Sequence, residues 1–230
     1  MVITMEFDRL EQLLGEKYEN VKNLSVLVLG VGGVGGYVVE SLARCGISKI
    51  ILVDYDTVDI TNINRQIIAL SSTIGKYKVD VFEDRIKEIN SNCEVIKIKE
   101  KITKENIDLI FNQNVDFIVD ACDTISVKKE IIKRCLSKKQ KFISSMGTAQ
   151  KLDPTKLVIT DLKNTSYDPI AKILRKYVKD EKLKGKIPVV SSLEEAKPLN
   201  GKNLGSTSFV PSVAGLFITS YIIREVIKND

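Results

Sequence analysis

The sequence predicts an α/β protein with a Rossmann-like, mostly parallel sheet, helices on both of its faces, and a smaller C-terminal portion. Three observations lead to this prediction. A glycine-rich turn lies between two apolar runs in residues 25–54. Short apolar runs then alternate with amphipathic segments as far as Gly147, and the pattern changes after that residue. Such β-then-α alternation is typical of a parallel sheet that is covered on both faces.

Residues 1–24 are predicted to form an N-terminal helical arm. Apolar side chains recur there at helical spacing, at Phe7, Leu10, Leu13 and Leu14. Because the arm precedes the first strand, we expect it to pack on another element or on another subunit.

The turn after the first apolar run contains Gly30, Gly32, Gly33 and Gly35. Gly30 lets the chain turn sharply off the strand, and Gly32 lets the backbone approach a phosphate without a Cβ in the way. Gly35 allows the following helix to lie close to the sheet, with its N-terminal N–H groups directed at an anion. Asp54 ends the second apolar run, where an acid accepts hydrogen bonds from ribose hydroxyls. A glycine turn alone is a weak signal, but this arrangement predicts nucleotide binding.

The later elements follow in order. We expect helices and strands, with approximate bounds, at 78–89 (helix), 94–98 (strand), 104–111 (helix), 117–119 (strand), 127–136 (helix), 142–145 (strand), 157–161 (strand), 169–178 (helix), 187–191 (strand) and 209–227 (helix). A loop is expected at 200–205. The last helix is apolar, but it is interrupted by polar residues, which favours a buried helix over a membrane span.

The composition excludes several chemistries. The 230 residues include no histidine, so histidine acid–base catalysis and histidine metal ligation are ruled out. The four cysteines are far apart and form no C-x-x-C pair, which indicates a reduced, cytoplasmic protein without a zinc ribbon. A net charge of +5 is compatible with a polyanionic partner, and a basic run at 172–186 is a candidate for phosphate contacts.

Two cations and an acid follow different elements of the same core. Arg65 and Lys78 are suited to neutralising phosphate oxygens, and Asp123 is suited to holding Mg²⁺. Taken singly, each of these residues is more typical of a solvated surface charge than of a ligand. Together they favour a nucleoside triphosphate over a dinucleotide cofactor.

Five ordered motifs resemble the adenylation core of the ubiquitin-activating-enzyme superfamily: the glycine turn, then 54–58, 62–66, 75–78 and 120–123. The resemblance implies that ATP and Mg²⁺ are bound and that a substrate carboxylate is adenylated. It implies that Asp54 holds the ribose, that Arg65 and Lys78 hold the phosphates, and that Asp123 holds the metal ion. Asp56, Asn62 and Gln66 belong to the same implied nucleotide site. It also implies a homodimer in which an arginine of the partner's N-terminal arm, in the place of Arg9, reaches the phosphates.

Residues after Gly147 resemble the tRNA threonylcarbamoyladenosine dehydratase branch, at 152–162, 167–175, 188–198 and 205–206. The resemblance implies ATP-dependent cyclisation of N6-threonylcarbamoyladenosine at position 37 of tRNA, with loss of water. It divides the chain into the arm (1–24), an ATP-binding adenylation core (25–150) and a portion that binds substrate and tRNA (151–230). Some members carry a cysteine just before the segment that begins at Val189; this chain has none there, which argues against a sulfur-relay partner.

Three other functions share some of these features. An activator of a ubiquitin-like or sulfur-carrier protein would use the same core, although paired zinc motifs and a thioester-cysteine domain are missing. An NAD-dependent oxidoreductase would leave Arg65, Lys78 and Asp123 without a role. The third is a nucleotide-binding scaffold without catalysis, and the intact phosphate and metal residues argue against it.

Overall fold

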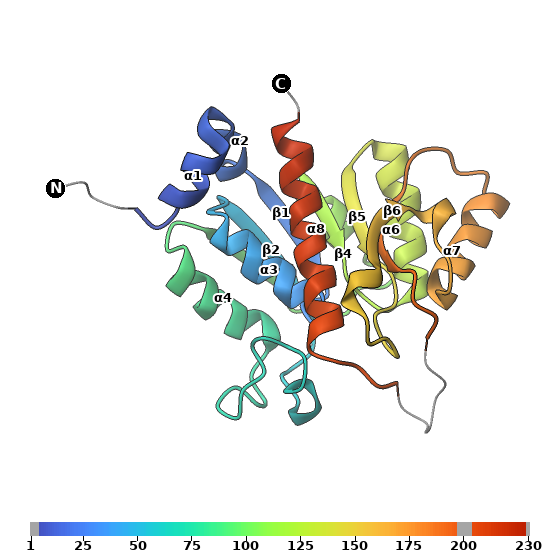
Figure 1. The fold of residues 1–230 in the computed structure, drawn as a ribbon, viewed down its shortest axis with the longest axis horizontal. Helices are drawn as coiled ribbons and strands as arrows, with labels where there is room; N and C mark the ends of the chain where they lie inside the picture. Colours follow the sequence, from blue (N-terminus) through green and yellow to red (C-terminus); the bar gives the residue numbers. More distant parts are fainter. Residues whose placement is uncertain (1–4, 197–203, 229–230) are drawn as a thin grey trace.

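One seven-stranded sheet organises the computed structural model, which describes residues 5–196 and 204–228 (Figure 1). Its strand order is β3-β2-β1-β4-β5-β7-β6, and only the β6–β7 pair is antiparallel. The strands are β1 (Ser25–Leu29), β2 (Lys49–Val53), β3 (Glu94–Ile98), β4 (Phe117–Asp120), β5 (Lys141–Ser145), β6 (Leu157–Asp161) and β7 (Pro188–Ser192). The predicted mostly parallel, Rossmann-like sheet is confirmed.

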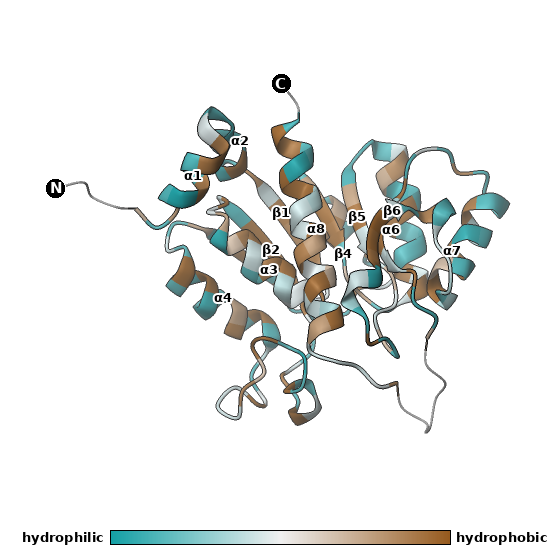
Figure 2. Ribbon diagram, in the orientation of Figure 1, coloured by the Kyte–Doolittle hydropathy of each residue, from teal (hydrophilic) through white to brown (hydrophobic). Residues whose placement is uncertain are grey.

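Helices cover both faces of the sheet because the side chains of each strand alternate between them. Val26 and Val28 of β1 face one core, and Leu27 and Leu29 face the other. Figure 2 shows the strands as predominantly hydrophobic and the outer side of α7 as hydrophilic. The first core is covered by α1 (Asp8–Leu14), α2 (Tyr18–Lys22), α3 (Gly35–Arg44), α4 (Lys78–Ile89) and α8 (Phe209–Ile227). The second is covered by α5 (Asp108–Phe111), α6 (Ile125–Lys138) and α7 (Pro169–Asp180).

Two elements differ from their predicted extents. The expected helix at 104–111 is reduced to α5, because residues 104–107 form turns. The N-terminal arm is not one continuous helix: α1 ends at Gly15, which has a φ of +57°, and a short 3₁₀ segment leads into α2. The predicted loop at 200–205 lies mostly outside the described residues.

Close backbone approach explains two glycines. Gly30 has a φ of +83°, as the sharp turn after β1 requires. A Cβ on Gly35 would lie 1.8 Å from the Gly30 carbonyl oxygen, so only glycine lets α3 begin this close to the turn.

The final helix packs against the sheet, as predicted. By length and composition α8 could span a membrane, but half of its most apolar window is buried inside this chain. It lies along α3, where a Cβ on Gly215 would come within 2.5 Å of the Val34 carbonyl oxygen. The C-terminal helix therefore helps to hold the glycine turn in place.

A buried ion pair between α3 and α4 should make folding pH-dependent. Burial by itself raises the pKa of Glu40, but hydrogen bonds from Arg85 and Arg44 outweigh this effect and lower the pKa below the ordinary value of 4.5. A group whose pKa is lowered on folding adds stability above its unfolded pKa and loses it as the pH falls through the folded pKa. We therefore expect the free energy of unfolding to decrease as the pH falls below the ordinary glutamate value of 4.5.

In the Glu40→Gln variant this acid-side decrease should be smaller, because no carboxylate is left at that position to be protonated. Urea unfolding at a series of pH values measures it. Glu94→Gln, at an exposed ion pair with Lys49, is the matched control and should follow the wild-type curve. Equal slopes for wild type and Glu40→Gln would contradict the assignment.

Candidate active site

A cavity of about 320 Å³ lies at the carboxyl ends of β1, β2 and β4. This is the edge of a parallel sheet at which nucleotides bind. The residues predicted for the nucleotide site that line it are Gly30, Gly32, Asp54, Asp56, Asn62, Arg65, Gln66, Lys78 and Asp123. The structure thus gathers side chains that are separated by up to 93 positions in the sequence (30 to 123). Gly33 and Gly35 shape the turn and do not line the cavity.

Asp54 is held rigidly at the cavity wall. Its Oδ2 accepts a hydrogen bond from the Val31 N–H at 2.9 Å, and its Oδ1 accepts one from the Asp56 N–H at 2.9 Å. The side chain is buried. A carboxylate has about four lone-pair positions, so two stay available for the hydroxyls of a ribose.

Positive charge comes from Lys78 and from two helix N-termini. Lys78 is the first residue of α4, is buried, and donates a hydrogen bond from Nζ to Asp56 Oδ2 at 2.8 Å. The α3 helix begins directly after the glycine turn. Because helix N-termini carry unpaired N–H groups and partial positive charge, this edge favours an anion.

The segment between β2 and α4 supplies Arg65 and two amides. Arg65 Nη1 donates to the Thr61 carbonyl oxygen and to Asn64 Oδ1, both at 2.9 Å. Asn62 Oδ1 accepts from the Asp59 N–H at 3.1 Å and so caps a 3₁₀ turn. Gln66 differs, because its Oε1 is buried with no hydrogen-bond partner among the described residues. An unpaired polar atom at the cavity wall indicates a polar ligand there.

Asp123 follows β4 and is exposed at the cavity. The only hydrogen bond it forms among the described residues is accepted from Thr124 Oγ1, at 3.4 Å. Within 5–196 and 204–228, no three acidic, cysteine or histidine side chains converge as a metal site. A single free carboxylate fits Mg²⁺ that is held mainly by phosphate oxygens and water.

A second cavity, of about 900 Å³, adjoins the first. Arg65, Ala121, Cys122 and Asp123 line both. Its other walls come from residues 145–151, the start of α7 and residues 204–206. Asp168 joins two of these walls: its Oδ2 accepts from the Gly147 N–H at 2.8 Å, and its Oδ1 caps α7. Of the predicted site residues, Arg65 and Asp123 line this second cavity and the others do not.

Sequence reasoning also missed a buried network beside the second cavity, which Lys128 and Ser145 line. Lys128 Nζ donates to Asp120 Oδ2 at 3.0 Å and to the Ser145 carbonyl oxygen at 2.8 Å. Ser144 Oγ donates to the same carboxylate oxygen at 2.8 Å. Asp120 and Lys128 are both almost fully buried. A lysine on the apolar side of α6, eight residues after a strand-end acid, was the available sequence signal.

The thiol of Cys122 is at the boundary of the two cavities, but its environment disfavours the reactive thiolate form. Burial, and then the charge of Asp120, raise the pKa of Cys122, and its Sγ donates to Asp120 Oδ1 at 3.2 Å. A nucleophilic cysteine needs a lowered pKa. We expect Cys122→Ala to keep turnover within about twofold, since changes that remove no essential contact cost little. Steady-state kinetics measure this, and a loss above about 100-fold would indicate covalent catalysis.

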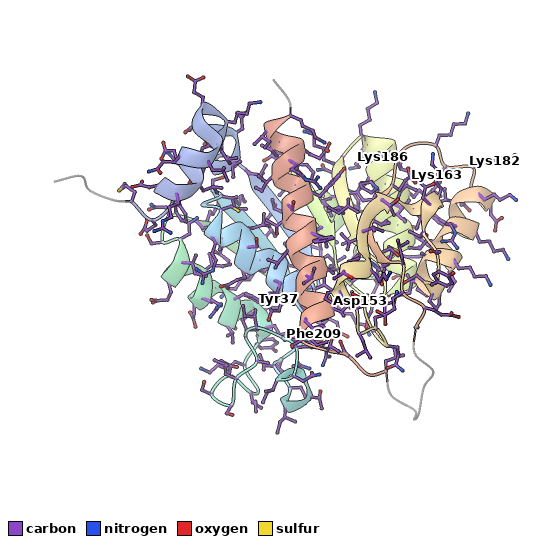
Figure 3. The ribbon with its side chains drawn as sticks, in the orientation of Figure 1. Tyr37, Asp153, Lys163, Lys182, Lys186 and Phe209 are labelled. Atoms are coloured by element: carbon purple, nitrogen blue, oxygen red, sulfur yellow. The ribbon has the colours of Figure 1, made fainter. Side chains whose placement is uncertain are left out.

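Two predicted regions lie away from the cavities. Arg9 is exposed on α1, which precedes β1 and lies at the amino-end edge of the sheet. Figure 3 places Lys163, Lys182 and Lys186 at one end of the molecule and Tyr37 and Phe209, which flank the glycine turn, at the other. Neither Arg9 nor the lysines at the end of the basic run line either of the two cavities described above.

Comparisons with known proteins agree with this geometry. The model of the ThiF family matches residues 8–223. The chain belongs to the ThiF family. The tRNA threonylcarbamoyladenosine dehydratase of Bacillus subtilis is 43% identical, over 97% of this chain and 95% of that protein. The enzyme of the same name from Haemophilus influenzae is 32% identical, over 100% of this chain and 98% of its own.

A solved structure extends the likeness to three dimensions. The E. coli tRNA N6-threonylcarbamoyladenosine dehydratase, determined in complex with ATP, superposes with a TM-score of 0.92 and 30% identity, covering 99% of this chain and 98% of that one. The predicted ThiF-type fold and the prediction of an ATP-dependent, adenylate-forming tRNA threonylcarbamoyladenosine dehydratase are confirmed. The roles of individual residues, Mg²⁺ and the dimer stay predictions.

Proposed function

We propose that the two cavities divide the substrates of one reaction, with ATP in the first and the N6-threonylcarbamoyladenosine of a tRNA in the second. The observation that carries this proposal is the shared boundary: Arg65 and Asp123 line both cavities. A carboxylate in the second cavity would meet the phosphates of a nucleotide in the first at this boundary. The glycine turn, the helix N-termini and the E. coli relative solved in complex with ATP support the assignment of the first cavity to ATP.

The reaction has two steps. An oxygen of the threonyl carboxylate attacks the α-phosphorus of ATP, and the bond to the pyrophosphate oxygen breaks, which gives an acyl-adenylate and pyrophosphate. The carbamoyl group of the same substrate then attacks the activated carbonyl carbon, loses a proton and expels AMP. The sum is loss of one water from the nucleoside. An intramolecular nucleophile needs no histidine or thiolate from the protein.

The residues contribute positioning and charge. Asp54 holds the ribose with its free lone pairs, and Lys78 and the α4 N-terminus stabilise negative charge on the phosphates. Arg65 leaves its carbonyl and amide partners to bind phosphate oxygens at the boundary. Asp123 holds Mg²⁺, which would neutralise phosphate charge when bound.

The test is to incubate the pure protein with ATP, Mg²⁺ and tRNA carrying N6-threonylcarbamoyladenosine, and then to weigh the nucleosides after digestion. The expected result is an ATP-dependent mass decrease of one water with release of AMP. An unchanged nucleoside with AMP still formed would overturn the proposal and direct attention to a small protein as the adenylated substrate.

We also propose a homodimer in which Arg9 acts at the partner's ATP site. Its support is the exposed position of Arg9 far from its own cavity and the N-terminal motif around it. A mixture of two inactive variants, Arg9→Ala and Asp123→Asn, should then recover part of the activity, up to about one quarter of wild type if subunits mix freely. The recovered activity is measured by assays after the subunits have exchanged, and each variant assayed alone is the control. The absence of any recovered activity in the mixed dimers would contradict this proposal. A protein that light scattering shows to be monomeric and that is fully active would also contradict it.

We propose that the tRNA contacts the part of the basic run (172–186) that lies nearest to the second cavity. Lys172 lies in the first turns of α7, whose Pro169 lines the second cavity, whereas Lys182 and Lys186 lie at the opposite end. Arg175 is already engaged, because its Nη1 donates to the Thr165 carbonyl oxygen at 2.9 Å. Action on tRNA and four free cysteines fit a protein of the cytoplasm.

A further inference from the structure

Lys151 is a buried lysine whose ammonium group has no hydrogen-bond partner among the described residues. Its side chain lines the second cavity, and the residue is only 3% exposed. Among the residues that the structure describes, its Nζ has no hydrogen-bond acceptor. A buried ammonium group loses its hydration, so it is unfavourable unless something else supplies acceptors. A site kept at such a cost is typical of a group that is completed by a ligand.

The nearest acids do not act as its structural partners. Burial lowers the pKa of Lys151, and the charges of Asp168 and Glu194 only oppose that shift. Both carboxylates are already bonded to backbone N–H groups. Asp168 accepts from Gly147 and Ala171, and Glu194 accepts from Leu152 and Asp153. These bonds hold the backbone of the cavity wall, and among the described residues neither carboxylate accepts a hydrogen bond from Lys151 Nζ.

The position of Lys151 is consistent with contact to a substrate in the second cavity. Gln150, directly before it, binds the opposite wall: its N–H donates to the Gly205 carbonyl oxygen at 2.9 Å, and its Oε1 accepts from the Gly205 N–H at 2.6 Å. Figure 3 shows Asp153, two residues further on, at the same end of the molecule as Tyr37 and Phe209, which is the end of the glycine turn. The segment that carries Lys151 is thus tied on both sides of the cavity.

We propose that Lys151 is the residue that recognises the threonylcarbamoyl group of the substrate, by donating hydrogen bonds to one of its oxygen atoms. The proposal rests on the assignment of the second cavity to the modified adenosine. A lysine ammonium group is a donor only, so it needs acceptors. The threonylcarbamoyl group brings a urea carbonyl, a hydroxyl and a carboxylate, all of which are absent from unmodified adenosine. A buried donor that stays unpaired with the wrong ligand rejects that ligand strongly.

A binding measurement tests the role of Lys151 independently of the reaction. Fluorescence anisotropy is measured with two labelled anticodon stem-loops, one with N6-threonylcarbamoyladenosine and one with plain adenosine at the same position. Wild type should prefer the modified loop, and Lys151→Met should reduce that preference by about tenfold or more. Lys151→Gln, which keeps a donor, should retain part of it. Lys156→Met, at an exposed lysine of the same segment, is the matched control and should bind like wild type.

Stability and kinetics exclude a merely structural role. Removing an unpaired buried charge should raise the thermal midpoint of Lys151→Met by about 2–4 °C, while the KM for tRNA increases and the KM for ATP does not change. A lowered midpoint together with weakened ATP binding would overturn the proposal. Equal binding of the two loops by wild type, or an unchanged preference in Lys151→Met, would also overturn it. A wild type that prefers the modified loop but does not dehydrate it would contradict the proposed function and leave the role of Lys151 standing.

Discussion

Replacing Asp123 with asparagine is expected to lower turnover by at least about 100-fold while the protein stays folded. The carboxylate is exposed at the boundary of the two cavities and accepts one long hydrogen bond, so the fold does not depend on it. Asparagine has the same shape but lacks the negative charge that holds Mg²⁺ beside phosphates. The loss should therefore appear in kcat, with far-ultraviolet circular dichroism and thermal midpoint unchanged.

The control is Asp180→Asn, at the exposed end of α7, which should turn over at the wild-type rate. The Mg²⁺ concentration that gives half-maximal activity adds a second measurement, and it should increase for Asp123→Asn if residual activity can be followed. Wild-type kinetics in Asp123→Asn would show that the metal ion is held elsewhere.

Lys128→Met is expected to cost about 3–5 kcal/mol of folding free energy, because it leaves the Asp120 carboxylate buried without its counter-charge. Both side chains are almost inaccessible to solvent, and the other partners of the carboxylate, Ser144 and the Cys122 thiol, supply only neutral hydrogen bonds. Urea unfolding measures the difference. Lys129→Met, one position along α6 and half-buried, should change the free energy of unfolding by less than about 1 kcal/mol.

Removing the charges of both Asp120 and Lys128 tests whether the unpaired charge causes the loss of stability. In the double variant Asp120→Leu with Lys128→Met, no charge is left unpaired, so much of the lost stability should return. Activity should stay low, because Asp120 also precedes the segment that carries Asp123 to the cavity boundary. A double variant as unstable as the single one would show that packing, and not the charge, explains the loss.

The nucleotide site could be predicted from the sequence because its residues follow local rules. Gly30 and Gly35 are needed for a sharp turn and a close helix, and these requirements act over a few positions. Asp54 ends a strand, so its place at the carboxyl edge follows from the alternation of elements alone. The same reasoning reached Lys78 and Asp123, which also come directly after a change of element. In the structure, Asp54, Lys78 and Asp123 line one cavity, which agrees with this reasoning.

Other expectations depended on more than local pattern. The basic run reads as one uniform surface in the sequence, but α7 carries it away from the cavity, so that Lys182 and Lys186 lie at the far end. Cys122 has the spacing of a residue at the site, and only its packing beside Asp120 shows that its pKa is raised.

The sequence by itself determined the fold class, the glycine turn and the acids and cations that line the first cavity, because those features depend on neighbours within a few residues. Only the tertiary structure decided which lysines are buried. Lys128 reaches its partners from a different element, and Lys151 has no partner at all among the described residues. Burial and pairing depend on segments that are distant in the chain, so the local pattern offers one signal for Lys128, its position on the apolar side of α6, and none for Lys151.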